Sequence, residues 1–263
     1  MKATVFLGGG RITSALVAGL QLAKYERPIV VHDRNLKKLR QLKSQYGVII
    51  EPDLHRAVEA AGLLLVAVRP DSVRELLKEI GEIRRPLTVV SLAAGIPLAR
   101  LQAGLRRPVR WVRAMPSPAS RSGRGLTAVT YSQGLSAAAR RQVHQLFSLV
   151  GPVMQIPESQ FDAFTVTYSS SHGYLALATL IEAAEAIGLN AASARVAAAH
   201  ALADGILAWR EGELPLDHLL REAATPGGIA AAVMDELDRA GYREIIVRGL
   251  RAGIKQARKN AKR

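Results

Sequence analysis

Cysteine is absent from this chain of 263 residues, and aromatic residues make up only 5% of it. The missing thiols exclude a disulfide framework, a thiolate metal site and a cysteine nucleophile, and we expect no metal. The scarcity of aromatics leaves few rings to stack on bases, so we expect no specific nucleic-acid partner despite a formal net charge of +14. The longest apolar run, residues 60–68, is interrupted by Gly62 and is too short to cross a bilayer.

The remaining composition is that of an ordinary globular protein, with 49% hydrophobic and 22% charged residues. The first residues enter an apolar strand pattern at once, which leaves no room for a signal peptide. We therefore expect a cytoplasmic protein without a membrane partner. Its overall positive field would favour an anionic cofactor and substrate.

Residues 4–16 combine a short apolar strand pattern, three consecutive glycines and an amphipathic helical pattern. Gly8 can adopt the dihedral angles of a tight turn, and Gly10 lacks a Cβ that would keep a pyrophosphate away from the backbone. The helix that opens at Arg11 and Ile12 directs free N–H groups at the same place. We therefore predict a dinucleotide site that includes these four residues.

The next apolar run ends in Asp33, close to the spacing at which a carboxylate meets an adenosine ribose. Asp33 alone would favour NAD. The cations that follow, Arg34 with Lys37 or Lys38, would suit a ribose 2′-phosphate, although the lysines could equally lie on a solvated helix face. We expect NADP as the cofactor, with NAD as the alternative.

Strand and helix patterns alternate over residues 1–157, which predicts an α/β fold: a Rossmann-type, doubly wound parallel sheet that binds NAD(P). Ligands of such sheets lie beyond the carboxyl ends of the strands. Several further strand patterns end at this same edge of the predicted sheet. We therefore expect additional cofactor contacts from the residues at their ends, Val68, Arg69, Pro70, Ala93 and Met115.

Residues 158–263 are rich in alanine and leucine and read as helices, apart from a strand-like pattern at Thr165–Ser171. One small helical domain cannot bury so many apolar residues by itself. We expect this α-helical domain to pack against a second subunit, so that the protein is a homodimer or a higher homo-oligomer.

From end to end, the chain resembles the pyrroline-5-carboxylate reductase family. The first matching stretch is common to dinucleotide folds, whereas the other four in this order are specific; the five are Phe6–Gly10, Ala67–Pro70, Ser91–Ile96, Val112–Pro116 and Thr225–Gly228. The resemblance implies an N-terminal NAD(P)H domain, an α-helical C-terminal dimerisation domain, and reduction of a cyclic imine acid to proline.

Three departures from the family pattern fall on its substrate side. Met115–Pro118 is one residue shorter than usual and lacks an asparagine, and Tyr168–His172 replaces a turn rich in glycine. Ala230 stands where the family places a threonine hydroxyl on the substrate. Hydride donation is therefore better supported than the identity of the acceptor. The alternatives are a reductase on the same scaffold that acts on another imine or a ketone, and an NADP-binding regulatory protein without catalysis.

Reduction of an imine requires a hydride at carbon and a proton at nitrogen. We expect the proton to come from His172, Tyr168 or Thr225, whose side chains can donate one. Gly227 and Gly228 precede a helix start and could bind a substrate carboxylate through N–H groups. The resemblance adds Glu213 and Ala230 to the substrate-binding candidates.

No lysine occurs between residues 79 and 254. Hydroxyacid dehydrogenases of similar two-domain plan use a lysine of the helical domain as acid and base. Its absence argues against oxidation of an alcohol.

Overall fold

The computed structural model describes residues 2–262, with side chains of residues 2–260. Its internal contacts divide the chain into two compact units. Unit 1 extends through Val166 and resumes at Gly253, and unit 2 covers Thr167–Ala252. This division differs from the boundary we expected after residue 157, because helix α7 (Glu158–Thr167) belongs almost wholly to unit 1. Within the described residues, no helix is both long and apolar enough to span a membrane.

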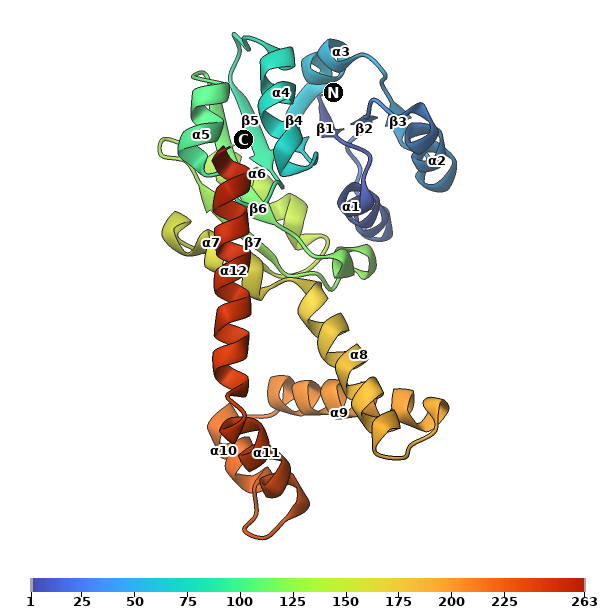
Figure 1. Ribbon diagram of the computed structural model, residues 1–263. Coiled ribbons are helices and arrows are strands. Elements are labelled where there is room, and N and C mark those ends of the chain that lie inside the picture. The colour runs from blue at the N-terminus through green and yellow to red at the C-terminus, as the bar shows by residue number, and fades with distance from the viewer. Residues whose placement is uncertain (1, 263) are drawn as a thin grey trace. The chain divides into compact units, whose positions relative to one another are not determined.

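Unit 1 alternates strands and helices, as the sequence patterns predicted (Figure 1). Its elements before α7 are β1 (Ala3–Leu7), α1 (Arg11–Leu22), β2 (Ile29–His32), α2 (Leu36–Tyr46), β3 (Ile49–Ile50), α3 (Leu54–Ala60), β4 (Ala61–Val66), α4 (Pro70–Ile80), β5 (Leu87–Ser91), α5 (Leu98–Gly104), β6 (Val109–Met115), the 3-10 helix η1 (Pro118–Ser122), β7 (Thr127–Tyr131), α6 (Ala137–Ser148) and β8 (Val153–Gln155).

The eight strands form one sheet in the order β3-β2-β1-β4-β5-β6-β7-β8. All neighbours are parallel except β6 and β7, which are antiparallel. A parallel crossover usually needs a dozen or more residues with a helix, and only the short η1 joins these two strands. The sheet is therefore mostly parallel, as the doubly wound fold predicts, with one antiparallel pair.

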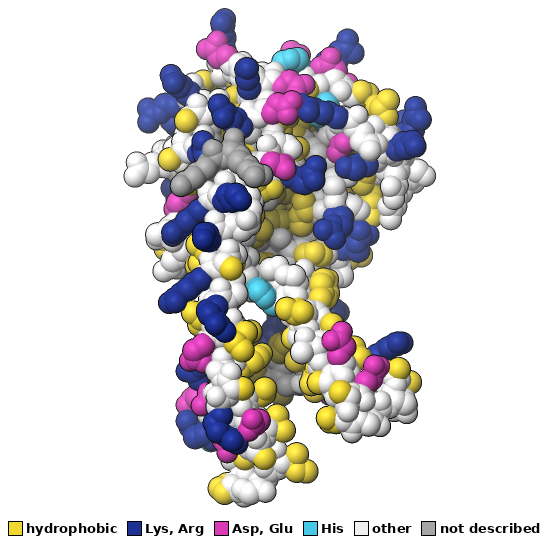
Figure 2. Space-filling view, viewed as in Figure 1, with side chains coloured by type: hydrophobic (Ala, Val, Ile, Leu, Met, Phe, Trp, Pro, Cys, Tyr) yellow, Lys and Arg dark blue, Asp and Glu magenta, His cyan; other side chains and the backbone are white. Residues whose placement is uncertain are grey.

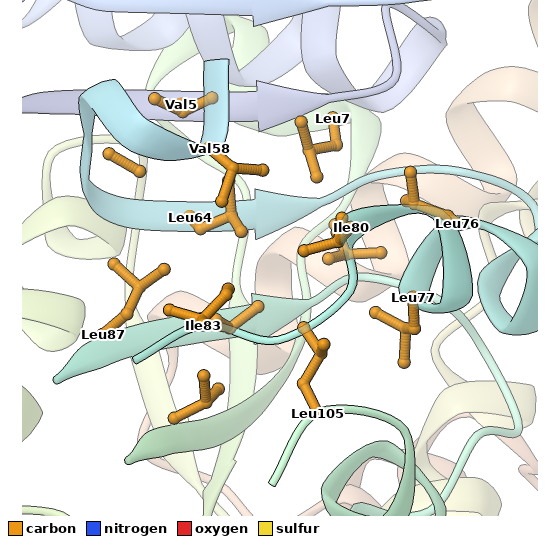
Figure 3. Close-up of a cluster of buried hydrophobic side chains, with 14 of the residues drawn as sticks. Val5, Leu7, Val58, Leu64, Leu76, Leu77, Ile80, Ile83, Leu87 and Leu105 are labelled. Carbon is orange, nitrogen blue, oxygen red and sulfur yellow. The ribbon is translucent and has the colours of Figure 1, made fainter. Parts of the chain in front are cut away.

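Two layers of helices cover the two faces of the sheet, because successive strand residues point to opposite sides. One apolar cluster joins Leu7 and Leu64 to α3, α4 and α5, and Figure 3 shows Leu76, Leu77 and Ile80 of α4 in the same cluster as these strand residues. The other joins Phe6, one position along β1, to α1, α2 and α6. Unit 1 therefore has a buried core on each face, as a doubly wound fold requires.

Unit 2 is helical and contains α8 (Ser170–Ala186), α9 (Ala191–Glu211), α10 (Leu216–Ala223), α11 (Ile229–Arg239) and the first turns of α12 (Tyr242–Lys262). The strand-like pattern at Thr165–Ser171 was wrong, since these residues end α7 and begin α8. The Thr165 hydroxyl donates to the Phe161 carbonyl one helical turn earlier at 2.7 Å, and the Ser169 side chain caps α8. Both polar groups are thus satisfied within helices.

Large apolar side chains lie exposed along unit 2, whose helices carry many yellow side chains in Figure 2. No residue of α8, α10 or α11 is buried, and Ile187 and Ile229 are 82% and 88% exposed. Exposed apolar surface of this extent is typical of an interaction surface. Unit 2 therefore lacks a core of the kind that unit 1 possesses.

Arg113 of β6 is a charged side chain with only 1% of its surface exposed. Its guanidinium donates to Glu158 at 2.9 Å and to Asp162 at 2.7 Å, both on α7, and lies 4.2 Å from the ring centroid of Phe161. Glu158 also accepts from the Leu98 N–H at the start of α5. These contacts hold α7 against the sheet.

We predict that the double substitution Glu158→Ala with Asp162→Ala lowers the free energy of unfolding by about 3–5 kcal/mol, because it leaves a buried guanidinium without a counter-charge. Arg113→Met should cost less, since the two carboxylates keep part of their water. Urea unfolding at neutral pH measures both. The control is Glu82→Ala, which breaks an exposed pair with Arg84 and should cost only about 0–1 kcal/mol. A double variant as stable as Arg113→Met would contradict this account.

Candidate functional site

The loops that follow four neighbouring strands meet at the carboxyl edge of the sheet. Backbone hydrogen bonds continue beyond the strands and join these loops: Gly8 N–H to His32 O at 2.7 Å, Ala67 N–H to Leu7 O at 2.8 Å and Leu92 N–H to Val66 O at 2.9 Å. The residues after β1, β2, β4 and β5 consequently lie side by side.

A cavity of about 650 Å³ opens at this edge. Its volume is within the usual range for a small-molecule or cofactor site, about 300–1,000 Å³. Seven of the predicted cofactor residues line it: Gly8, Gly10, Arg11, Asp33, Arg34, Val68 and Arg69.

Gly8 and Gly10 serve this cavity in different ways. Gly8 has φ +112°, and a Cβ there would lie 2.7 Å from the Ala67 carbonyl oxygen, so the protein itself requires glycine. The Thr13 hydroxyl donates to the Gly8 carbonyl at 2.5 Å and braces the turn. Gly10 has an ordinary φ of −81°, and a Cβ there would meet no atom within 4 Å. Its missing side chain therefore leaves free space on the cavity side.

Helix α1 begins at Arg11 with Gly10 as its N-cap, and no side chain caps it. The first N–H groups of a helix have no partner within the helix, and they carry the positive end of its dipole. An uncapped helix start beside a glycine with open space is suited to bind a phosphate group.

Asp33 lines the cavity with a carboxylate that already accepts two backbone hydrogen bonds. Gly9 N–H donates to it at 2.7 Å, and Asn35 N–H donates to its other oxygen at 2.7 Å. Lys38, which also lines the cavity, lies 3.9 Å away. Asp33 thus fixes the glycine turn and still has lone pairs for a ligand hydroxyl.

Arg34 is held by two carboxylates of α4. Its guanidinium donates to Glu79 at 2.6 Å and to Glu75 at 3.3 Å. The hydrogen bonds to Glu79 and Glu75 raise the pKa of Arg34 above its ordinary value. The side chain stays 63% exposed, so Arg34 is a permanent cation at the rim of the cavity.

Four other predicted cofactor residues do not line this cavity. Ile12 packs against the second core cluster, and Ala93 is only 3% exposed. Met115 packs against a small cluster around Phe161, while Pro70 lines a separate cavity between α4 and α5. Their contact with a cofactor stays a prediction.

The sequence reading missed His32 and Ser72, which both line the cavity. His32 ends β2 and lies 7% exposed, with Nδ1 3.0 Å from the Glu51 carbonyl oxygen. Since a carbonyl only accepts, we assign a proton to Nδ1. The available signals were its place just before Asp33 and the place of Ser72 in the first turn of α4.

The predicted catalytic and substrate residues belong to unit 2, whereas the cavity belongs to unit 1. Tyr168 lies in the turn between α7 and α8, and His172 is exposed in the first turn of α8. Glu213 is exposed in the connection between α9 and α10.

The segment Thr225–Gly228 forms a tight turn that leads into α11. Gly228 N–H donates to the Thr225 carbonyl at 2.9 Å, and Gly227 has φ +75°, as a type II turn after Pro226 requires. Gly228 is also the N-cap of α11, which no side chain caps. The Gly228 N–H is thus used within the turn, while Ala230 lies exposed in the first turn of α11.

Two protein-family models match different parts of the chain. The model described as "NADP oxidoreductase coenzyme F420-dependent" matches residues 4–95. The model described as "Pyrroline-5-carboxylate reductase dimerisation" matches residues 158–260.

Individual relatives cover nearly the whole chain. The pyrroline-5-carboxylate reductase of Corynebacterium melassecola is 32% identical over 259 residues, which is 96% of each chain. The solved structure of a pyrroline-5-carboxylate reductase from Coxiella burnetii is 25% identical, with a TM-score of 0.86 over 100% of this chain and 99% of that one. A Plasmodium falciparum pyrroline carboxylate reductase with NADP bound is 18% identical, with a TM-score of 0.86 over 98% of both chains, and shares the fold.

The specific motifs, the mostly parallel α/β unit, the helical unit and an identity above 30% along almost the full length agree with one another. The chain belongs to the pyrroline-5-carboxylate reductase family.

Proposed function

We propose that this protein reduces pyrroline-5-carboxylate, a cyclic imine acid, to proline with NADPH. The observation that carries the proposal is the uncapped start of α1 beside Gly10, in a chain related along almost its full length to a pyrroline-5-carboxylate reductase. The alternative is a reductase on the same scaffold that acts on another imine or on a ketone.

The residues at the carboxyl edge of the sheet fit a dinucleotide. Gly10 leaves room for a pyrophosphate, the N–H groups that begin α1 bind its charge, and Asp33 accepts from a ribose hydroxyl. Arg34 and Lys38 supply positive charge for a 2′-phosphate, which favours NADP over NAD. Bound NADPH supplies the hydride for the imine carbon.

The substrate side is assigned to unit 2. Because Gly228 N–H is used within its turn, we assign the substrate carboxylate to Gly227 N–H and to the free N–H groups that begin α11, including that of Ala230. His172, Tyr168 or Thr225 delivers the proton to the imine nitrogen, and Glu213 lies among the substrate-binding residues. A cyclic imine is partly protonated near neutral pH, so correct positioning contributes much of the acceleration.

We further propose that the protein is a cytoplasmic homodimer, or a larger homo-oligomer, assembled through unit 2. The exposed apolar side chains of α8–α12 and the match of residues 158–260 to a dimerisation model support this assembly.

The direct test is to mix the purified protein with pyrroline-5-carboxylate and NADPH and to measure both NADPH consumption and proline formation. We expect one proline for each NADPH oxidised. Tight NADPH binding without proline formation would favour another acceptor, which a panel of cyclic imines and ketones would identify. Failure to bind either nicotinamide cofactor would overturn the proposal.

We predict that Gly10→Val abolishes binding of NADPH and leaves the fold intact. Valine tolerates the backbone angles of this residue, and its side chain would extend into free space that the pyrophosphate needs. Calorimetric titration measures the binding, and thermal unfolding without cofactor serves as the control for folding. Native affinity in this variant would show that the glycine loop is only a turn.

We predict that Arg34→Ala weakens the binding of NADPH by about 1–3 kcal/mol, because a charged contact to the 2′-phosphate is lost. The binding of NADH should weaken far less. Glu79→Gln should have the opposite effect on the preference, since it releases Arg34 from its shortest pair. Lys43→Ala removes a cation from α2 that does not line the cavity and is the matched control. Equal weakening of both cofactors by Arg34→Ala would sink the assignment.

We predict that Ala230→Thr raises turnover of pyrroline-5-carboxylate by up to about tenfold, the equivalent of one regained hydrogen bond of about 0.5–1.5 kcal/mol. His172→Ala should lower turnover if the histidine delivers the proton. Both are measured at several pH values with NADPH. An inactive wild type that gains nothing from Ala230→Thr points to a different acceptor, whereas neutral effects on an active enzyme show that solvent supplies the proton.

A further inference from the structure

Unit 1 contains a second cavity, of about 490 Å³, between α4, α5 and the last turns of α12. Its floor is apolar and is formed by Val73, Leu77, Ile96 and Leu101, all members of the core cluster on that face. The cavity at the carboxyl edge of the sheet, called the dinucleotide cavity below, is lined by two other α4 residues, Ser72 and Leu76. The two cavities are therefore lined by different positions of α4.

Three cations stand around this floor: Arg74 and Lys78 on α4 and Arg100 on α5. Their side chains are exposed and make no hydrogen bond or ion pair with any residue that the structure describes. The α4 carboxylates Glu75 and Glu79 are both paired with Arg34 instead. The positive charge of the cavity is thus not neutralised by the surrounding side chains.

The placement of these cations is electrostatically unfavourable in the protein alone. Arg74 and Lys78 are four residues apart on one helix face, where like charges repel each other. Arg100, on the neighbouring helix α5, adds a third positive charge to the same lining. A bound anion would relieve the repulsion between Arg74 and Lys78.

We propose that this cavity binds a small organic anion with an apolar body, of the chemical class of medium-chain carboxylates. The charge complementarity assigns the anionic group to Arg74, Lys78 and Arg100, and the apolar floor takes the hydrocarbon. The side chain of Asn260, which also lines the cavity, offers an additional amide donor. The volume suits a small molecule, and none of the described residues that line the cavity is aromatic, which disfavours a nucleobase.

The test uses the full-length protein with ¹³C-labelled methyl groups and octanoate below its micelle concentration as the probe. We expect saturable chemical-shift changes at the methyls of Val73, Leu77, Ile96 and Leu101. Octanol, with the same apolar body and no charge, should bind about tenfold more weakly or worse, as expected for the loss of a charged contact. No change at these methyls, or equal affinity for octanol and octanoate, would overturn the proposal.

Two variants separate the roles of charge and space. Replacing Arg74, Lys78 and Arg100 with alanine should lower the affinity for octanoate about tenfold or more. Arg106→Ala, which removes a cation outside the cavity, should have no effect. Ala103→Trp keeps every charge and should abolish binding by filling the space. Unaltered binding in the triple variant would refute the assignment, as would saturable shifts with a hexaglutamate peptide and none with octanoate, which would indicate an acidic protein segment.

None of the substituted residues lines the dinucleotide cavity, so NADPH affinity and turnover should stay at the wild-type level in all of these variants. Loss of octanoate binding with intact reductase activity thereby distinguishes this site from the proposed active site.

Discussion

The approach of the β1–α1 turn to the end of β4 is the constraint on which the cofactor site depends. Gly8 leaves no space for a Cβ, because the Ala67 carbonyl oxygen would lie 2.7 Å from it, and its φ of +112° is itself a glycine conformation. This approach brings the loops after β1 and β4 into one cavity wall. It also places Gly9 N–H on Asp33, so the loop after β2 joins the same wall. A side chain at Gly8 would separate all three loops together.

The charged side chains at the rim of the cavity are paired within the protein. The strength of each pair decides which of these side chains a ligand can draw away from its partner. Asp33 is mostly buried and bonded to two backbone N–H groups, so it is held in place. Arg34 is bonded only to exposed carboxylates, and exposed ion pairs contribute only about 0–1 kcal/mol. A phosphate can therefore draw Arg34 away from Glu75 and Glu79 at little cost. The same rim can accept a free ribose hydroxyl at Asp33, which is why NAD stays the alternative cofactor.

The sequence patterns predicted the features that depend on residues close together in the chain. The glycine turn, the α1 start and the buried strand β4 follow from residue types within a few positions, and the structure confirms the α/β unit and the helical unit. Strand direction has no local pattern, so the reversal of β7 escaped prediction. The pairing of Arg34 with α4 joins residues distant in sequence. Ala93 and Met115 fall at the ends of β5 and β6 but do not line this cavity, and their contact with a cofactor stays a prediction.

The two units differ in how they are stabilised. Unit 1 buries apolar side chains on both faces of its sheet, whereas α8, α10 and α11 of unit 2 bury none within this chain. Burial of apolar surface contributes about 25 cal/mol per Å², so a second copy that covers unit 2 would supply the stability that it lacks. Ile229, 88% exposed, directly follows Gly228 and precedes Ala230. If the partner subunit of the proposed homodimer covers Ile229, the interface and the proposed substrate loop would meet at the start of α11.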